Sequence, residues 1–180
     1  MPAAPHRPMA LRLAAAGLRL AHRVSGGRIG SLDPAKAAPR GRALEVITKV
    51  HVRLYVWTHG LIGANTNGLP TLLLTTTGRK TGLARTVPLP YFLHPEGYAV
   101  VASFAGNPKN PAWFDNLVAQ PEVVVQVGPS RFRALATPAG PDERPALWSS
   151  ITAASGQYAD YQQVTQREIP VVILRPSGFC

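Results

Sequence analysis

The feature that most constrains the fold of this chain is a series of short β-rich segments separated by turn residues. Six segments have strand length and are rich in β-branched and aromatic residues: 71–77, 85–93, 98–104, 122–127, 131–137 and 169–174. Short turn sequences at 78–82, 94–97 and 128–130 favour antiparallel pairing of the segments on either side. We therefore expect a mainly β protein with flanking helices, whose antiparallel sheet meanders and closes into a barrel.

Helical patterns flank and interrupt these segments. Asn110 followed by Pro111 predicts a helix with Asn110 as its N-cap, and Pro121 predicts its end. Two further helices are expected from about residue 141 and over residues 157–165. Upstream, a stripe with helical spacing contains β-branched residues that also allow a strand, and its members are Val46, Val50, Leu54 and Trp57.

Residues 1–41 are expected to form an N-terminal extension to a single domain at 42–180. Residues 9–24 predict a basic amphipathic helix, with apolar Leu11, Ala14, Ala15 and Leu18 beside Arg12, Arg19 and Arg23. Residues 25–41 are rich in Gly, Pro and Ala and predict a linker. The apolar run is too weak for a secretory signal and the single cysteine is Cys180, so we expect a cytoplasmic protein.

The formal charge of +10 is unevenly distributed. Residues 1–53 contain ten Lys or Arg and two acidic residues, a net +8, whereas the remainder contains nine against seven. Three of those nine lie together at Arg79, Lys80 and Arg85. A nucleic-acid-binding module is disfavoured, because the barrel region has no basic stripe interleaved with aromatic residues.

The segment from Thr75 to Arg85 has the composition of a binding turn. A strand enters the sequence TTTGRKTG, which combines two glycines, several hydroxyl groups and cations. Glycine lets a ligand approach the backbone closely, while Arg and Lys bind phosphate or carboxylate oxygens. An anion-binding turn is one interpretation, and a solvated basic turn without a ligand is the other.

Two further segments are candidates for a site. Residues 102–113 run from a strand through a loop to a predicted helix N-terminus, where free N–H groups favour negative charge. Tyr158 and Tyr161 lie one helical turn apart and suit an aromatic substrate. Core packing is the alternative for both tyrosines and for Trp113 and Phe114. The five histidines lack metal-ligand spacing, so no metal site is predicted.

Four segments in order resemble the deazaflavin (coenzyme F420)-dependent nitroreductase family of antiparallel split β-barrel oxidoreductases. They are LLLTTTGRKTGLARTVPL, VVASFAGNPKNPAWFDNL, NLVAQPEVVVQVG and QYADYQQVTQREIPVVIL, and they span about residues 70–176. The most specific part is the combination of the TTTGRKTG block and Arg85 with the KNPAW block. The resemblance implies a split β-barrel and coenzyme F420 as the cofactor, and the N-terminal helical extension expected from residues 9–24 lies upstream of the matched segments.

By this resemblance the phosphate and oligoglutamate tail of the deazaflavin meet the first hairpin, and the ring lies against residues 101–104 and 112–116. The cofactor-binding residues that it implies are Leu73, Leu74, Thr75, Arg79, Lys80, Thr81, Gly82, Leu83, Ala84, Arg85, Val101, Ala102, Ser103, Phe104, Ala112, Trp113, Phe114, Asp115, Asn116 and Tyr158. Ser103, Tyr158 and Tyr161 correspond to groups beside the ring and the substrate, and they are the candidate catalytic residues.

The resemblance also implies a reaction, namely hydride transfer from reduced F420 to a small organic acceptor such as a quinone, a nitroaromatic or an activated alkene. Ser103 or Tyr158 is the candidate for polarising or protonating that acceptor. The chain departs from its relatives at 153–156, where a further tyrosine can occur, and at Phe104, where a basic residue can occur. Both departures affect which substrate the chain is expected to accept, and neither affects the expected cofactor.

Other interpretations remain at this point. A non-catalytic deazaflavin carrier would share the cofactor residues, and an FMN enzyme would share the barrel, although the cations favour F420. A homodimer is expected as one mode of assembly. The basic 9–24 helix fits peripheral contact with an anionic membrane at the inner face of the cell membrane, or packing on the barrel or a dimer partner.

Overall fold

The computed structural model describes residues 42–179, and the predicted helix at 9–24 and linker at 25–41 lie outside this range. The helices in this range are α3 (Arg42–Trp57), the short 3-10 helix η2 (Phe104–Gly106), α4 (Ala112–Ala119), α5 (Arg144–Ala154) and α6 (Gln157–Gln163). The strands are β1 (Asn65–Thr66), β2 (Leu69–Thr77), β3 (Ala84–His94), β4 (Gly97–Val101), β5 (Glu122–Val127), β6 (Ser130–Pro138) and β7 (Val171–Phe179). None of the helices over this range is long and apolar enough to cross a membrane.

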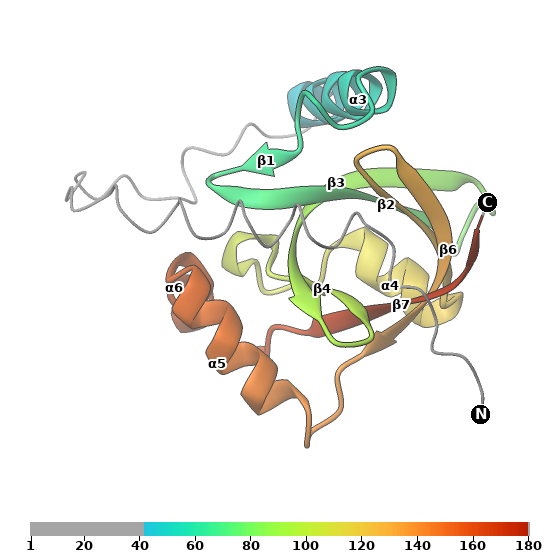
Figure 1. Cartoon of the computed structure of the whole chain (residues 1–180). Coiled ribbons are helices and arrows are strands. Elements are labelled where there is room, and N and C mark those ends of the chain that lie inside the picture. Colours follow the sequence, from blue (N-terminus) through green and yellow to red (C-terminus); the bar gives the residue numbers. More distant parts are fainter. Residues whose placement is uncertain (1–41, 180) are drawn as a thin grey trace, which may run out of the picture. The chain divides into compact units, whose positions relative to one another are not determined.

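Strands β2 to β7 form a closed antiparallel barrel (Figure 1). The strand order is β1-β2-β3-β4-β7-β6-β5, and pairing of β2 with β5, with Leu74 opposite Val125, joins the two ends of this order. The short turns connect β2 to β3, β3 to β4 and β5 to β6, as the sequence predicts. The expected barrel is therefore confirmed.

The barrel interior is filled by residues that alternate along the strands. In β6, for example, Phe132, Ala134 and Ala136 are buried while the residues between them are exposed, as the period of two in a strand requires. They pack against Leu72, Leu74, Val100, Val125 and Leu174 from the other strands. A second apolar cluster lies between the barrel and helices α5 and α6, and it contains Ile151, Tyr158 and Ile169.

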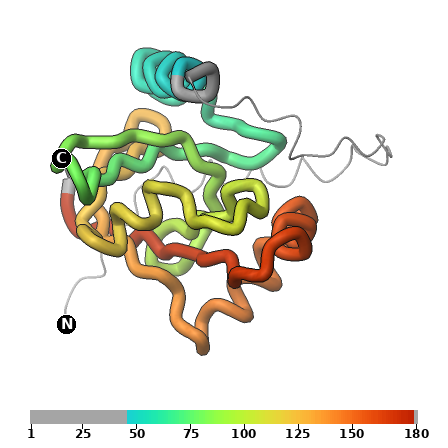
Figure 2. The backbone as a smooth tube through the Cα atoms, turned by 180° about the vertical axis from the view of Figure 1, so that it is seen from behind, coloured from blue at the N-terminus to red at the C-terminus, as the bar shows by residue number. Residues whose placement is uncertain are grey.

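Several predicted boundaries are wrong by a few residues, and β7, predicted at 169–174, runs from Val171 to Phe179. The segment 98–104 is not a strand throughout, because β4 ends at Val101 and the chain turns into η2, where Phe104 has φ 47°. Pro111, not Asn110, is the N-cap of α4, with extended φ −66° and ψ 146°. The Asn110 side chain instead accepts a hydrogen bond from Arg167 at 2.9 Å. The view from behind in Figure 2 brings the chain from β4 to α4 to the front.

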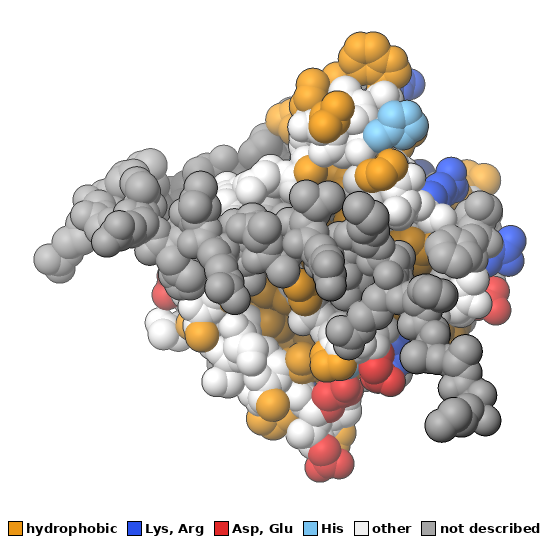
Figure 3. All heavy atoms as spheres, in the orientation of Figure 1, with side chains coloured by type: hydrophobic (Ala, Val, Ile, Leu, Met, Phe, Trp, Pro, Cys, Tyr) orange, Lys and Arg blue, Asp and Glu red, His pale blue; other side chains and the backbone are white. Residues whose placement is uncertain are grey.

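Helix α3 settles the ambiguity between helix and strand in favour of the helix. Its Tyr55 is fully buried and fastens it to the barrel, donating to the Thr71 carbonyl at 2.9 Å and accepting from the Gly128 N–H at 2.9 Å. The predicted apolar stripe of Val46, Val50, Leu54 and Trp57 is exposed, with Trp57 at 78%. Hydrophobic side chains accordingly gather over α3 in Figure 3.

Candidate functional site

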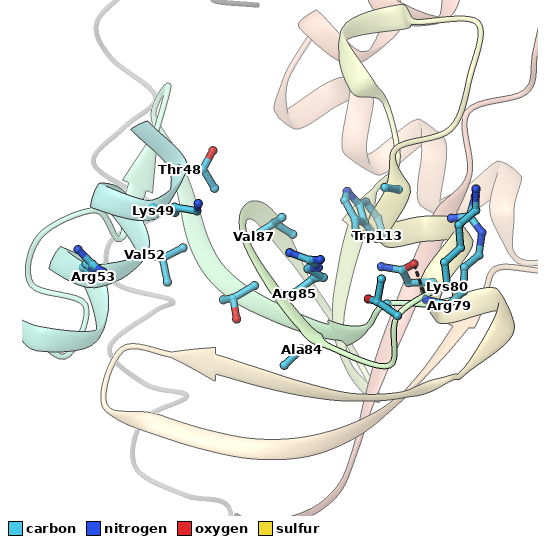
Figure 4. A pocket seen from close by; sticks show the side chains of 15 residues that line it. Thr48, Lys49, Val52, Arg53, Arg79, Lys80, Ala84, Arg85, Val87 and Trp113 are labelled. Atoms are coloured by element: carbon cyan, nitrogen blue, oxygen red, sulfur yellow. Dashed lines mark hydrogen bonds between the residues drawn. The ribbon is translucent and has the colours of Figure 1, made fainter. Parts of the chain in front are cut away.

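A groove of about 590 Å³ lies between α3, the β2–β3 turn, β3 and α4. In Figure 4, Lys49 and Val52 on α3 face Arg85 and Val87 on β3. Trp113 and the turn with Arg79 and Lys80 lie on the side of the groove away from α3. The lining residues are Thr48, Lys49, Val52, Arg53, Gly78, Arg79, Lys80, Thr81, Ala84, Arg85, Thr86, Val87, Ala112, Trp113 and Asn116. The groove thus combines apolar surface with five cations.

The charge of the groove is strongly one-sided. Arg79, Lys80 and Arg85 come from the hairpin, and Lys49 and Arg53 come from α3, one helical turn apart. Arg79 pairs with Asp115 at 3.1 Å, but no described carboxylate lies within ion-pair distance of Lys80 or Arg85. Like charges gathered in one concave surface raise the local concentration of anions. The groove therefore suits a ligand with several negative charges.

The hairpin turn that carries these cations has a fixed backbone. Gly78 accepts hydrogen bonds from the N–H groups of Thr81 at 3.0 Å and Gly82 at 2.7 Å, and its own N–H donates to Leu83 at 2.8 Å. Gly82 has φ 68°, a conformation that residues with a Cβ rarely adopt. A cation on such a turn is held near one place before a ligand arrives.

Asn116 ties this turn to α4. Its side chain is buried, accepts a hydrogen bond from the Arg79 N–H at 3.1 Å and donates to the Thr76 hydroxyl at 3.2 Å. Because both polar ends of the amide are used within the protein, Asn116 positions the turn through its side chain. The sequence points to Asn116 only as a residue beside the cofactor.

A second region contains the candidate catalytic residues. Tyr158 is 3% exposed, and its ring packs edge-on against Phe92, with centroids 5.7 Å apart, and against Tyr161 at 6.2 Å. Burial raises the pKa of Tyr158 to about 12, so its hydroxyl stays protonated at neutral pH. Within the described range no group hydrogen bonds to this hydroxyl, and Ser103, half-buried at the start of η2, makes no side-chain capping bond.

The groove brings together eight of the residues predicted to bind the cofactor, which are Arg79, Lys80, Thr81, Ala84, Arg85, Ala112, Trp113 and Asn116. The remaining predicted residues do not line it. Leu73, Leu74, Val101 and Ala102 are buried, Thr75 pairs with Thr86 across the hairpin at 2.9 Å, Gly82, Leu83 and Phe104 are exposed, and Phe114, Asp115 and Ser103 are half-buried.

The contribution of α3 to this groove was not predicted from the sequence. Thr48, Lys49, Val52 and Arg53 line the groove, yet in the sequence Lys49 and Arg53 stand out only as part of the N-terminal charge excess. Their spacing of four residues on a predicted helix was the available signal. Nothing in that spacing indicates which other element they face.

One cluster of metal-ligand residue types occurs elsewhere among the described residues. His94, Glu96 and Glu143 bring potential ligand atoms within 4.8 Å of one another. The Arg175 guanidinium lies 2.7 Å from Glu96 and 3.7 Å from Glu143, and its hydrogen bond to Glu96 lowers the pKa of that carboxyl. We interpret this cluster as an ion-pair network, because an arginine already neutralises its carboxylates.

Comparison with known proteins identifies similar chains. The model of a family described as F420H(2)-dependent quinone reductase matches residues 47–176. A protein of Mycobacterium tuberculosis named F420H(2)-dependent quinone reductase is 40% identical over 132 residues, covering 71% of this chain and 89% of that protein.

Solved structures agree with that family. A structure described as an F420-H2 dependent reductase is 41% identical, has a TM-score of 0.55 and covers 59% of this chain and 94% of its own. Another, described as a domain-swapped dimer, is 34% identical, has a TM-score of 0.57 and covers 74% of this chain and 99% of its own.

Proposed function

The chain belongs to the F420H(2)-dependent quinone reductase family and is an oxidoreductase that uses coenzyme F420, and from this premise we propose that its acceptor is a quinone. Membership of a family of quinone reductases supports this choice over a nitroaromatic or an activated alkene. An apolar, planar acceptor also agrees with the aromatic side chains at Tyr158 and Tyr161.

The observation that carries the placement of the cofactor is the fit between the groove and the polyanionic half of F420. The phosphate and glutamate carboxylates of F420 need several cations, and the groove offers Lys80 and Arg85 without a described carboxylate partner. Arg79 is shared with Asp115, which keeps its guanidinium at the mouth of the groove. We infer that the phosphate lies at the hairpin turn.

Helix α3 extends this proposal to the tail. Lys49 and Arg53 lie on the wall opposite the hairpin, and we assign them to the glutamate carboxylates that continue beyond the phosphate. Val52, Val87 and Trp113 offer apolar surface to the uncharged parts of the cofactor. All of the cations that we assign to F420 lie within residues 42–179.

The reacting end is assigned to the segments 101–104 and 112–116 and to the tyrosines of α6. Reduction of a quinone to a hydroquinone needs one hydride, which the reduced deazaflavin supplies when bound, and one proton. Ser103 and Tyr158 are the candidate donors, because both hydroxyls lack a described hydrogen-bond partner within the fold. Tyr161 packs on Tyr158 and is assigned to the substrate side.

A comparison of acceptors tests the proposal. The full chain is mixed with reduced F420 and a naphthoquinone, a nitroaromatic or an activated cyclic enone, and the return of the oxidised deazaflavin absorbance is followed. We expect the highest kcat/KM with the quinone, measured against reactions without protein. Turnover of the enone or the nitroaromatic without turnover of the quinone would refute the quinone assignment and leave F420-dependent reduction intact.

We also propose that the chain forms a homodimer. One of the related structures is described as a domain-swapped dimer, and the apolar stripe on α3 is exposed in the single chain. A second copy would cover this stripe. Analytical ultracentrifugation should give a dimer that Val50→Lys with Leu54→Lys converts to a monomer, and a monomeric unsubstituted chain would contradict the idea.

A further inference from the structure

Arg167 makes an unusual set of contacts with the loop that follows β4. Its Nε donates to the Asn107 carbonyl at 2.8 Å, and its Nη1 donates to the Asn110 Oδ1 at 2.9 Å. Its Nη2 donates to the carbonyls of Ala102 at 3.0 Å and Ser103 at 2.7 Å. One guanidinium therefore fastens both ends of a loop that lies about 60 residues away in the sequence.

This loop has an unfavourable backbone that needs such support. Phe104, Ala105 and Gly106 are consecutive residues with φ of 47°, 50° and 74°. Residues with a Cβ rarely adopt positive φ, and they do so where the surrounding structure imposes it. Phe104 and Ala105 are exposed, so their own side-chain packing does not impose this conformation.

The loop also packs directly on α6. A Cβ on Gly106 would overlap the Val164 Cγ2 and lie 2.9 Å from the Tyr161 carbonyl oxygen. Any shift of the loop therefore changes the relation between Ser103 and the helix that carries Tyr158 and Tyr161. Arg167 follows α6 in the chain and donates hydrogen bonds to the same loop.

The contacts of Arg167 indicate a structural role in holding the loop. It has no carboxylate partner among residues 42–179, and all four acceptors are carbonyl or amide oxygens. Burial lowers the pKa of Arg167, yet an arginine stays protonated in proteins. Only a planar guanidinium with several N–H groups can serve these four acceptors at once, so a lysine cannot replace it.

We propose that Arg167 is a positioning residue for hydride and proton transfer, which holds Ser103 and the left-handed loop against α6 in the geometry that the reaction requires. This inference rests on the proposed function, because that function assigns the reacting end to Ser103 and Tyr158. It assigns to Arg167 no contact with the cofactor or substrate.

The test separates the rate of the chemical step from cofactor binding. In single-turnover experiments with reduced F420 and the quinone, Arg167→Lys should lower the rate by about 10²-fold, the effect of misplacing reacting groups by roughly 1 Å. The Kd for F420 should be unchanged, because the groove cations are intact. The absorption band of the bound deazaflavin should shift, since its surroundings at the loop change.

Arg144→Lys is the matched control. Arg144 is also largely buried and pairs with Glu168 at 2.9 Å. Its Nε and Nη2 donate hydrogen bonds to the backbone carbonyl of Ile169 at 3.3 Å and 3.0 Å. It does not contact the loop. Its substitution should leave the single-turnover rate and the absorption band unchanged, and an equal loss of rate in both variants would overturn the inference.

A second variant keeps Arg167 in place. Gly106→Ala should displace the loop because of the short contacts to Val164 and Tyr161, and we expect the same loss of rate with unchanged F420 affinity. Full single-turnover rates in Gly106→Ala and Arg167→Lys would overturn the positioning role. They would leave the proposed function standing, because the unsubstituted enzyme would still reduce the quinone. Failure of the unsubstituted chain to reduce any acceptor would refute the proposed function instead.

Discussion

At the scale of single residues, the cations of the groove differ in what they have available for a ligand. Arg79 shares its guanidinium with Asp115 at 3.1 Å, and both side chains are partly exposed. Lys80 and Arg85 have no such partner among the described side chains. An anionic ligand therefore gains most from Lys80 and Arg85, since it does not compete with a carboxylate there.

We predict that replacing Lys80 and Arg85 together with Ala weakens F420 binding by roughly 2 to 4 kcal/mol. Each hydrogen bond to a charged group contributes on the order of 1.5 to 3 kcal/mol, and solvent exposure lowers that contribution. A fluorescence titration at low and high salt measures the loss, which should shrink as salt increases. Arg131→Ala with Arg133→Ala, on the exposed face of β6, removes equal charge and should leave affinity unchanged.

A second prediction concerns the hydroxyl of Tyr158. Tyr158→Phe keeps the ring packed against Phe92 and removes the proposed proton donor, so the single-turnover rate should fall by about 10²-fold. Because its pKa is raised to about 12, the hydroxyl remains protonated, and no decline in rate from this group should appear below about pH 10. A Phe variant with the full rate would leave Tyr158 as a packing residue.

The raised pKa of Tyr158 also predicts how the free energy of unfolding depends on pH. Tyr158 ionises in the unfolded chain near its usual pKa of about 10 but in the folded chain only near 12. The unfolded state therefore loses protons first, and the free energy of unfolding should fall as the pH rises from about 10 to 12. The Phe variant should show a smaller fall in urea unfolding over that interval.

At the scale of elements, the attachment of α3 decides whether the groove has two walls. Tyr55 is the main polar contact, because its hydroxyl joins the carbonyl of Thr71 on β2 and the N–H of Gly128 in the β5–β6 turn. A second contact joins the His51 ring and the Gly63 carbonyl at 2.9 Å. The wall that contains Lys49 and Arg53 depends on these few bonds.

We predict that Tyr55→Phe lowers the free energy of unfolding by on the order of 1 to 3 kcal/mol, because the buried Thr71 carbonyl and the half-buried Gly128 N–H lose their partner. It should also weaken F420 binding, since the cations of α3 lose their place. Chemical denaturation and F420 titration measure the two effects. Tyr91→Phe is the control, because Tyr91 is also buried and its hydroxyl has no described hydrogen-bond partner. Unchanged affinity in Tyr55→Phe would contradict the role of α3.

At the scale of the whole molecule, the N-terminal extension carries much of the positive charge. Residues 1–41 contain seven of the 19 Lys and Arg residues and lie outside the described range. A basic amphipathic helix at 9–24 would bind anionic lipid, where each cation near the surface adds about 1 kcal/mol. Such binding would place the enzyme at the inner face of the membrane.

We predict that the full chain sediments with anionic vesicles at low salt and is released at high salt. A chain beginning at Gly41 should stay in solution and still bind F420, because every groove residue lies downstream of that point. Neutral vesicles provide the control for apolar insertion alone. If the full chain also stays in solution with anionic vesicles at low salt, the predicted membrane contact is wrong.

The sequence by itself determined what depends on neighbouring residues. Alternation along segments such as 131–137 requires a strand with one buried face, and the short turns at 78–82, 94–97 and 128–130 leave antiparallel pairing as the simple connection. Arg79, Lys80 and Arg85 lie in one turn and its following strand, so they meet whatever the rest of the chain does. The three hairpins of the barrel and one wall of the groove follow from these local rules.

Only the tertiary structure decided which distant segments meet. Lys49 faces the hairpin because Tyr55 fastens α3 across β2, and Arg167 reaches Asn107 across 60 residues because α6 packs on the loop. The same long-range contact takes the Asn110 side chain away from the helix cap that its local sequence favours. Closure of a barrel sets such distances, and sequence periodicity carries no information about them because it reports only the spacing along one element.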